Sequence, residues 1–140
     1  MPAYSKTPLA KKLGIRENFR IRLINIPEYY SDLFTDWPPN VNITRNHRIR
    51  KNLIHFFIKK ADELYSALPD LKSEIEEDGM IWVSWPKKAS KIQSDLTENI
   101  IRNFALEIGL VDIKVCSIDD IWSGLKLVIP VKSRVQKKVE

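Results

Sequence analysis

The run Leu53-Ile54-His55-Phe56-Phe57-Ile58 constrains the fold more than any other stretch of the sequence. It is short, rich in β-forming residues and almost wholly apolar. A strand of this kind is buried on both faces, which is typical of a sheet that has helices on either side. Residues 80–85 form a second such run. Because 140 residues suffice for one domain with a sizeable core, we expect a single α/β domain over residues 1–140.

The rest of the chain predicts strands and helices in alternation. Further strands are expected over residues 19–25, 41–44, 111–116 and 123–131, and helices over 27–34 and 60–78. Leu64, Leu68, Leu71 and Ile75 share one face of the longer helix, Pro69 predicts a kink in it, and Gly79 ends it. Another helix opens at residues 94–98, where Asp95 and Glu98 resemble a capping box, and ends at Gly109.

This order predicts a three-layer α/β sandwich with a mostly parallel sheet. The segment between the last two strands is too short for a crossover helix. We therefore expect an antiparallel C-terminal hairpin to close the sheet. Residues 1–15 are expected to form a strap across the domain, and residues 132–140 a basic tail.

Composition excludes several classes of protein. No apolar run reaches the ~20 residues that a membrane span requires, and the N-terminus lacks the apolar segment of a secretory signal, so a cytoplasmic location is expected. Cys116 has no partner for an internal disulfide and is expected to be a small buried hydrophobe. Neither His47 nor His55 has a second ligand at zinc-type spacing, and no metal site is expected.

The loop after the strand 80–85 is the strongest candidate site. Ligands of open α/β sheets bind beyond the carboxyl ends of strands, often at helix N-termini. Lysines and hydroxyl groups in this loop suit a phosphate or a carboxylate, while a solvated loop is the simpler alternative. The last strand is expected to lie beside it. The candidate anion-binding residues are Ser84, Trp85, Lys87, Lys88, Ser90, Lys91, Ser94, Trp122 and Lys126.

Two basic segments suggest a different partner. The net charge is +5, and positive residues gather at 45–51 and in the tail 132–138. These segments fit nucleic acid or another anionic partner. They contain no interleaved aromatic residues or glycines, so solvated surface is the simpler interpretation.

Five blocks of the sequence carry a family resemblance. They are TPLAKKLG (7–14), IWVSWPKK (81–88), DLTE (95–98), GLVD (109–112) and WSGLK (122–126). Together they resemble an uncharacterised bacterial family, a domain of unknown function. The order of elements resembles the Rossmann-like fold of S-adenosylmethionine-dependent methyltransferases. The resemblance implies that fold and no established activity.

Two features of methyltransferases are missing from this sequence. Their first strand ends in a glycine-rich turn, whereas this chain has Asn25-Ile26-Pro27-Glu28. Their second strand ends in an acidic residue that binds ribose hydroxyls, whereas this chain has Thr44-Arg45-Asn46. Proline removes an N–H group, and Ile26 puts a branched side chain where the cofactor would lie. We expect no cofactor.

The leading hypothesis is a non-enzymatic protein with a degenerate cofactor site that binds a ligand or a partner. The ligand would be a small anion, a nucleotide or a protein partner near residues 85–94. One alternative is an enzyme that uses the same loop to hold a small anionic substrate. The other is a nucleic-acid-binding protein that uses the two basic segments. No membrane partner is expected.

Overall fold

The structure, a computed structural model, describes residues 7–134. Its sheet has the order β2-β1-β3-β4-β6-β5. The strands are β1 (Arg20–Ile24), β2 (Asn42–Ile43), β3 (Lys51–Phe57), β4 (Ile75–Pro86), β5 (Val111–Ser117) and β6 (Trp122–Val128). The helices are α1 (Leu9–Leu13), α2 (Ala61–Lys72) and α3 (Glu98–Glu107). Short 3-10 turns follow at η1 (Tyr30–Leu33), η2 (Lys88–Ser90) and η3 (Val131–Ser133).

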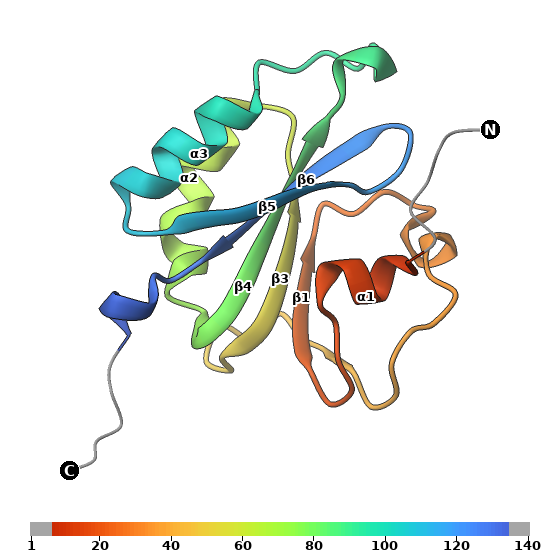
Figure 1. The fold of residues 1–140 in the computed structure, drawn as a ribbon, viewed down its shortest axis with the longest axis vertical. Helices are drawn as coiled ribbons and strands as arrows, with labels where there is room; N and C mark the ends of the chain where they lie inside the picture. Colours follow the sequence, from red (N-terminus) through yellow and green to blue (C-terminus); the bar gives the residue numbers. More distant parts are fainter. Residues whose placement is uncertain (1–6, 135–140) are drawn as a thin grey trace.

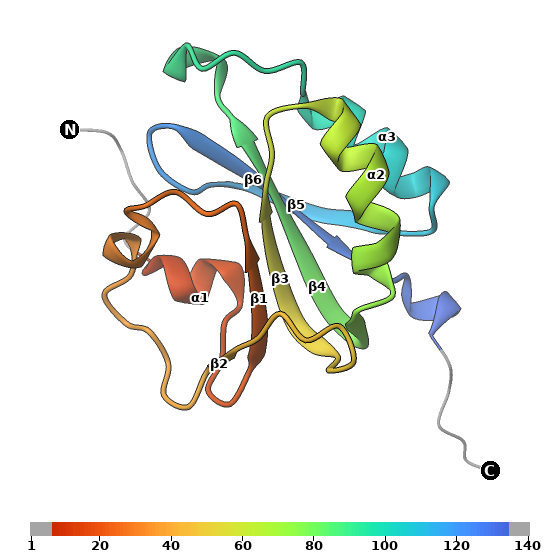
Figure 2. The same cartoon turned by 180° about the vertical axis from the view of Figure 1, so that it is seen from behind.

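The sheet confirms the predicted fold class. Strands β2, β1, β3 and β4 run parallel to one another, and β6 runs antiparallel to both β4 and β5. Helices α2 and α3 lie side by side on one face of the sheet, and α1 lies on the other (Figures 1 and 2). The chain is therefore a three-layer α/β sandwich whose mostly parallel sheet is closed by an antiparallel hairpin.

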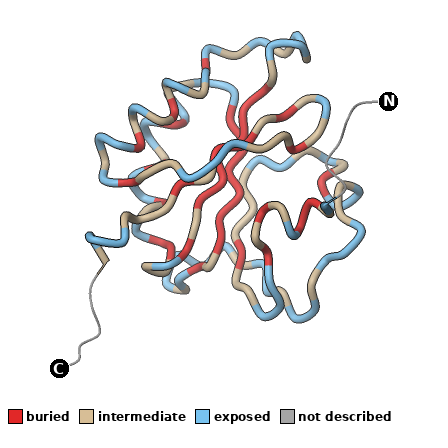
Figure 3. The backbone as a smooth tube through the Cα atoms, viewed as in Figure 1, coloured by how far each residue is buried: buried red, intermediate tan, exposed pale blue. Residues whose placement is uncertain are grey.

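Each face of the sheet has its own core, and the central strands are buried on both sides (Figure 3). Ile54 and Phe56 of β3 pack beneath α2 and α3. Leu53 and Phe57 pack on the α1 side. Alternate residues of one strand thus fill opposite cores, as the apolar run predicted.

Helix α1 is anchored to the centre of the sheet. The indole Nε1 of Trp82 donates to the carbonyl of Leu13 at 2.8 Å, in a buried position. Gly14 ends the helix in the left-handed region, with φ 84°. The part of the predicted strap that begins at Leu9 is packed in this way, and residues 1–6 lie outside the described residues.

The prediction of a helix over residues 60–78 is wrong for residues 73–78. Helix α2 continues through Pro69 but ends at Lys72, where Ser73 takes the C-cap position. Ile75 instead begins β4, and Lys51 at the start of β3 donates its N–H to the carbonyl of Glu74 at 2.8 Å. Ile75 has helical spacing from Leu71, but pairing with β3 decides its conformation.

Gly79 lies within β4 and does not end a helix. A Cβ atom there would come within 3.0 Å of the carbonyl oxygens of Glu76 and Lys51. The β3–β4 register is irregular here, between Lys51 and Leu53. Glycine is required because two backbone segments approach closely at this bulge.

Two smaller predictions are also corrected. The helix expected over 27–34 is reduced to the turn η1. The N-cap of α3 is Thr97, whose Oγ1 accepts from the N–H of Ile100 at 3.2 Å. Asp95 accepts from the N–H of Ala61 at 2.7 Å, and so caps α2 rather than α3.

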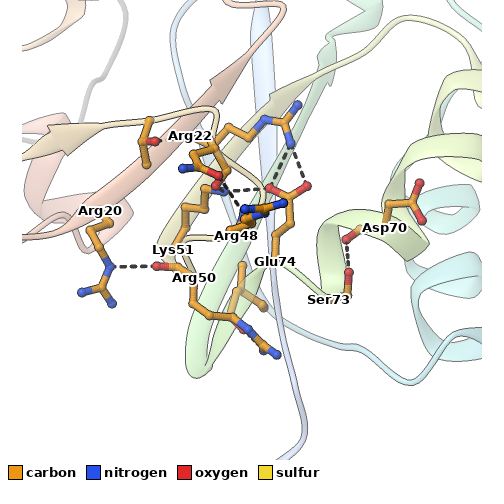
Figure 4. A network of polar contacts seen from close by, with 11 residues as sticks. Arg20, Arg22, Arg48, Arg50, Lys51, Asp70, Ser73 and Glu74 are labelled. Carbon is orange, nitrogen blue, oxygen red and sulfur yellow. Dashed lines mark hydrogen bonds and ion pairs between the residues drawn. The ribbon is translucent and has the colours of Figure 1, made fainter.

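Lys51 was expected in a solvated basic loop, but its side chain is fully buried. Its Nζ donates to Glu74 at 2.9 Å and to the carbonyl of Asn46 at 2.6 Å. Glu74 also accepts from Arg22 through both oxygens, at 2.8 and 2.9 Å (Figure 4). Burial alone would raise the pKa of Glu74, but the hydrogen bonds from Lys51 and Arg22 outweigh it and hold that pKa below its ordinary value.

Candidate functional site

The carboxyl end of β1 is the topological switch point of the sheet. Strand β2, which follows β1 in the chain, pairs with one side of β1. Strand β3, which comes next, pairs with the other side. In open α/β sheets this arrangement opens a crevice beyond the strand ends, where ligands bind. Two hollows lie there, one on each side of the turn that follows β1.

The first, which we name the aromatic hollow, has a volume of about 390 Å³. Its walls are mostly apolar, and Glu28 and Ser31 supply the polar groups. The rings of Tyr30 and Phe34 are 5.0 Å apart between centroids, and those of Phe34 and Trp37 are 4.8 Å apart. The full lining is Leu23, Ile26, Glu28, Tyr30, Ser31, Phe34, Trp37 and Ile43.

The second, which we name the polar hollow, has a volume of about 410 Å³. It lies between the ends of β1 and β3, which the Nδ2 of Asn25 joins by donating to the carbonyl of Phe57 at 3.2 Å. Trp122 from the start of β6 packs edge-on against Phe57 at 5.0 Å. The full lining is Asn25, Ile26, Pro27, Glu28, Phe57, Ile58, Lys59, Glu63 and Trp122.

The turn after β1 forms a ridge between the two hollows. Asn25 has φ 58°, a left-handed conformation that asparagine tolerates better than most residues. Ile26 is 39% exposed, and both Ile26 and Glu28 line both hollows. Pro27 offers no N–H group to a ligand. The ridge therefore presents side chains where a glycine-rich turn would present backbone.

A buried chain of hydrogen bonds lies behind the aromatic hollow. The hydroxyl of Tyr30 is 2.8 Å from Nδ1 of His55, and Nε2 of His55 is 2.8 Å from Oγ of Ser84. Burial raises the pKa of Tyr30 and lowers the pKa of His55 to about 3, so the imidazole is neutral. His55 and Ser84 have no exposed surface, and Ser84 lines neither hollow. This Tyr-His-Ser arrangement holds the core together and presents no nucleophile to a ligand.

The structure does not bring all of the predicted anion-binding residues together at one surface. Ser84 and Trp85 are buried in the sheet. The hydroxyl of Ser90 donates to the carbonyl of Lys87, and that of Ser94 donates to the carbonyl of Lys59. The loop hydroxyls are thus engaged by the protein itself.

The charged and aromatic members of that set lie in three different places. Lys87 donates to the hydroxyl of Ser117 at 2.7 Å, while Lys88 and Lys91 are exposed. Trp122 lies opposite Pro86 and lines the polar hollow. Lys126 lies opposite Trp82, which comes four residues before Pro86 on β4. Burial lowers the pKa of Lys126. The anion site at this loop stays a prediction.

Sequence reasoning did not single out Phe34, Trp37 and Ile43 of the aromatic hollow. Tyr30, Phe34, Trp37 and Ile43 come from three segments that converge only in the fold. The available signal was the density of aromatic residues between β1 and the prolines at 38 and 39.

The described part of the chain also sets limits on other kinds of site. Over residues 7–134, no group of three or more His, Cys, Asp or Glu side chains is placed to hold a metal ion. None of the helices in that range has the length and apolar character needed to cross a membrane.

Residues 47–131 match the model of a family described as a protein of unknown function (DUF3052). No curated protein sequence matches the chain significantly. Solved structures of methyltransferases share its fold. A ribosomal protein L11 methylase from Lactobacillus delbrueckii subsp. bulgaricus is 12% identical with a TM-score of 0.56, over 86% of this chain and 74% of that one.

Two further structures give the same result. A TehB-like SAM-dependent methyltransferase from Corynebacterium glutamicum is 10% identical, with a TM-score of 0.54, over 87% of this chain and 85% of its own. The magnesium protoporphyrin IX methyltransferase from Synechocystis PCC 6803 with bound SAH is 10% identical, with a TM-score of 0.52, over 87% and 78%. At these identities the likeness concerns the fold alone.

Proposed function

The chain belongs to the family of proteins of unknown function DUF3052, and we propose that it is a non-enzymatic ligand-binding protein with a remodelled methyltransferase-like cofactor site. The ligand is a small organic cation or aromatic amine that occupies the aromatic hollow. The ridge formed by Ile26 carries this proposal. Its side chain lines both hollows, at a turn where glycine would leave the backbone open to a ligand.

The residues at the switch point do not fit S-adenosylmethionine. The branched side chain of Ile26 occupies the position from which a glycine backbone would contact a cofactor, and Pro27 lacks the N–H group. Thr44, Arg45 and Asn46 after β2 offer no carboxylate for ribose hydroxyls. We therefore derive no methyl transfer through this site.

The chemistry of the aromatic hollow favours a cationic or N–H-rich ring. Tyr30, Phe34 and Trp37 provide aromatic walls, and Glu28 provides a carboxylate at the ridge. Aromatic side chains attract cations through the negative faces of their rings, and a nearby carboxylate adds to that attraction. A volume of about 390 Å³ lies within the range of small-molecule sites.

Trp37 offers a direct readout of this hollow. The chain has four tryptophans, of which Trp82, Trp85 and Trp122 are buried and Trp37 is 39% exposed. Titration with phenethylamine, choline, adenosine and S-adenosylmethionine, followed by fluorescence and by calorimetry, tests the proposal. We expect heat and a fluorescence change with the amines, the change being lost in Trp37→Phe and the heat being reduced in Glu28→Gln.

The matched control is Glu63→Gln, because Glu63 lines only the polar hollow. It should leave binding of the amines unchanged. Saturable binding of S-adenosylmethionine to the wild-type chain would overturn the proposal, as would the absence of heat with every amine. Ile26→Gly is expected to merge the hollows and to admit larger ligands than the wild type.

A further inference from the structure

Strand β5 forms one of the two edges of the sheet. It bonds to β6 on one side, and no strand of residues 7–134 lies on its other side. Three consecutive residues, Ile113, Lys114 and Val115, are exposed, with Ile113 at 53% and Val115 at 44%. Unpaired backbone groups on an edge strand form a template for an added strand.

The two faces of β5 differ in chemistry. Val115 pairs with Leu125, which packs in the core beneath α2 and α3, so Val115 points to that face. Lys114 pairs with Lys126 and points to the opposite face, where α1 lies. Consecutive residues of this edge therefore offer a cation on one face and an apolar group on the other.

The cations on the α1 side are not neutralised. Like charges directly opposite each other on neighbouring strands destabilise a sheet, and Lys114 and Lys126 form such a pair. Lys12 adds a third charge nearby, with its Nζ donating to the carbonyl of Ser117 at 3.1 Å. None of the three forms an ion pair with another residue in 7–134. Burial and the charge of Lys114 both lower the pKa of Lys126, which is consistent with unrelieved repulsion.

The carboxylates closest in sequence do not relieve this repulsion. Asp112 points to the helix-covered face and pairs with Arg102 at 2.9 Å. Asp119 lies in the hairpin turn, where its Oδ1 accepts from the N–H groups of Ile121 and Trp122. Residues 7–134 therefore supply no anionic partner for the three lysines.

We propose that β5 and the lysines Lys12, Lys114 and Lys126 dock an extended acidic segment of a protein partner. The segment adds as a strand along residues 114–117, beyond the irregularity between Asp112 and Lys114. Its residues alternate between carboxylates, which face the three lysines, and apolar side chains, which lie beside Val115. Strand addition of this kind draws affinity from main-chain hydrogen bonds and specificity from alternate side chains. The inference does not depend on the ligand of the aromatic hollow.

Charge and composition favour this partner over two others. A second copy of the chain would bring another Lys114 to the same edge, and two chains of net charge +5 repel each other. Single-stranded nucleic acid stacks its bases on exposed aromatic rings, and β5 and β6 offer only Trp122, which is buried.

The probe is a fluorescein-labelled peptide of alternating glutamate and valine, about the length of β5, measured by fluorescence anisotropy. We expect saturable binding that weakens with salt. A peptide of alternating lysine and valine should not bind. A glutamate-valine peptide that is N-methylated at alternate residues should also fail, because it keeps its charge but cannot pair along that edge.

The protein variants separate local charge from net charge. Lys114→Glu should weaken binding by about tenfold or more, a change of about 1.4 kcal/mol or more. Lys60→Glu makes the same change in net charge at another exposed site and should alter binding less than about twofold. Equal losses in the two variants would overturn the proposal, and so would full binding of the N-methylated peptide. Dimerisation of the free chain through β5, seen by size-exclusion chromatography and abolished by Lys114→Glu, would assign the edge to a second copy instead.

Discussion

Nε2 of His55 lies 2.8 Å from Oγ of Ser84 in the middle of the sheet, where neither side chain reaches solvent. His55 belongs to β3 and Ser84 to the neighbouring β4. Tyr30, from the turn η1, occupies the other ring nitrogen. The three side chains bind the segment after β1 to the two central strands, and so they fix one wall of the aromatic hollow.

Protonation of His55 is expected to destabilise the fold. The folded-state pKa is about 3 because of burial, against 6.5 for a free histidine. The unfolded chain therefore binds a proton that the folded chain does not, and stability falls as pH drops below 6.5 towards 3. Between pH 7 and pH 5 we expect a loss of about 2 kcal/mol, measured by urea denaturation.

The histidine variants test this assignment. His55→Gln should remove most of that pH dependence, although it lowers stability at pH 7. His47→Gln should retain it, because His47 is the other histidine of the chain and is exposed. An unchanged slope in His55→Gln would refute the assignment.

Glu74→Gln is expected to be strongly destabilising. The change leaves Lys51, which has no exposed side-chain surface, without its counter-charge. Breaking a buried pair by removing one partner costs about 3–5 kcal/mol. Glu76→Gln is the control, because its pair with Arg20 is 38% and 39% exposed and should contribute at most about 1 kcal/mol. Chemical denaturation measures both variants, and similar losses would argue against a special role for the buried pair.

Trp82→Phe is expected to loosen α1. The substitution removes the N–H group that bonds to the carbonyl of Leu13 and leaves that buried acceptor unpaired, at a cost of about 1–3 kcal/mol. Hydrogen exchange should accelerate at the amides of Gly14 and Ile15. Trp85→Phe removes a similar volume from the opposite core and should leave those amides protected. Equal exchange in the two variants would show that the bond does not anchor α1.

The anion site predicted at residues 84–94 is tested by Lys88→Ala combined with Lys91→Ala. Both lysines are exposed, so the double variant should fold normally. A bound anion at ~100 times its dissociation constant stabilises the folded state by ~2.7 kcal/mol. A thermal shift with phosphate in the wild type, lost in the double variant, is the expected result if the loop binds anions. The same shift in both proteins would exclude these lysines.

Much of the architecture was predictable because it depends on local patterns. The run at residues 53–58 required a strand covered on both faces, and the short link after β5 required an antiparallel hairpin. The turn Asn25-Ile26-Pro27-Glu28 also revealed, without coordinates, that a glycine-rich cofactor turn is missing. In each case the deciding residues are neighbours in the chain.

The helix boundary at residue 73 and the environment of Lys51 were not predictable in this way. Ile75 has the spacing of a helical residue, and pairing with β3 makes it the start of a strand. Lys51 is typical of a solvated loop, and its ion pair with Glu74 and its hydrogen bond to the carbonyl of Asn46 hold it in the interior. Tertiary contacts outweigh local propensity wherever backbone pairing or a counter-charge changes the cost of burial.

The sequence by itself determined the layers of the fold and the burial of the central strands on both faces, because short-range periodicity sets which side chains must be buried. It also determined the absence of a glycine-rich turn, because the residues of that turn are neighbours in the chain. Only the tertiary structure decided the two hollows, the Tyr30–His55–Ser84 chain and the Lys114–Lys126 pair. Their members come from separate elements that only the folded chain brings together. The ridge after β1 is therefore a second candidate site beside the loop at residues 84–94, where the anion site stays a prediction.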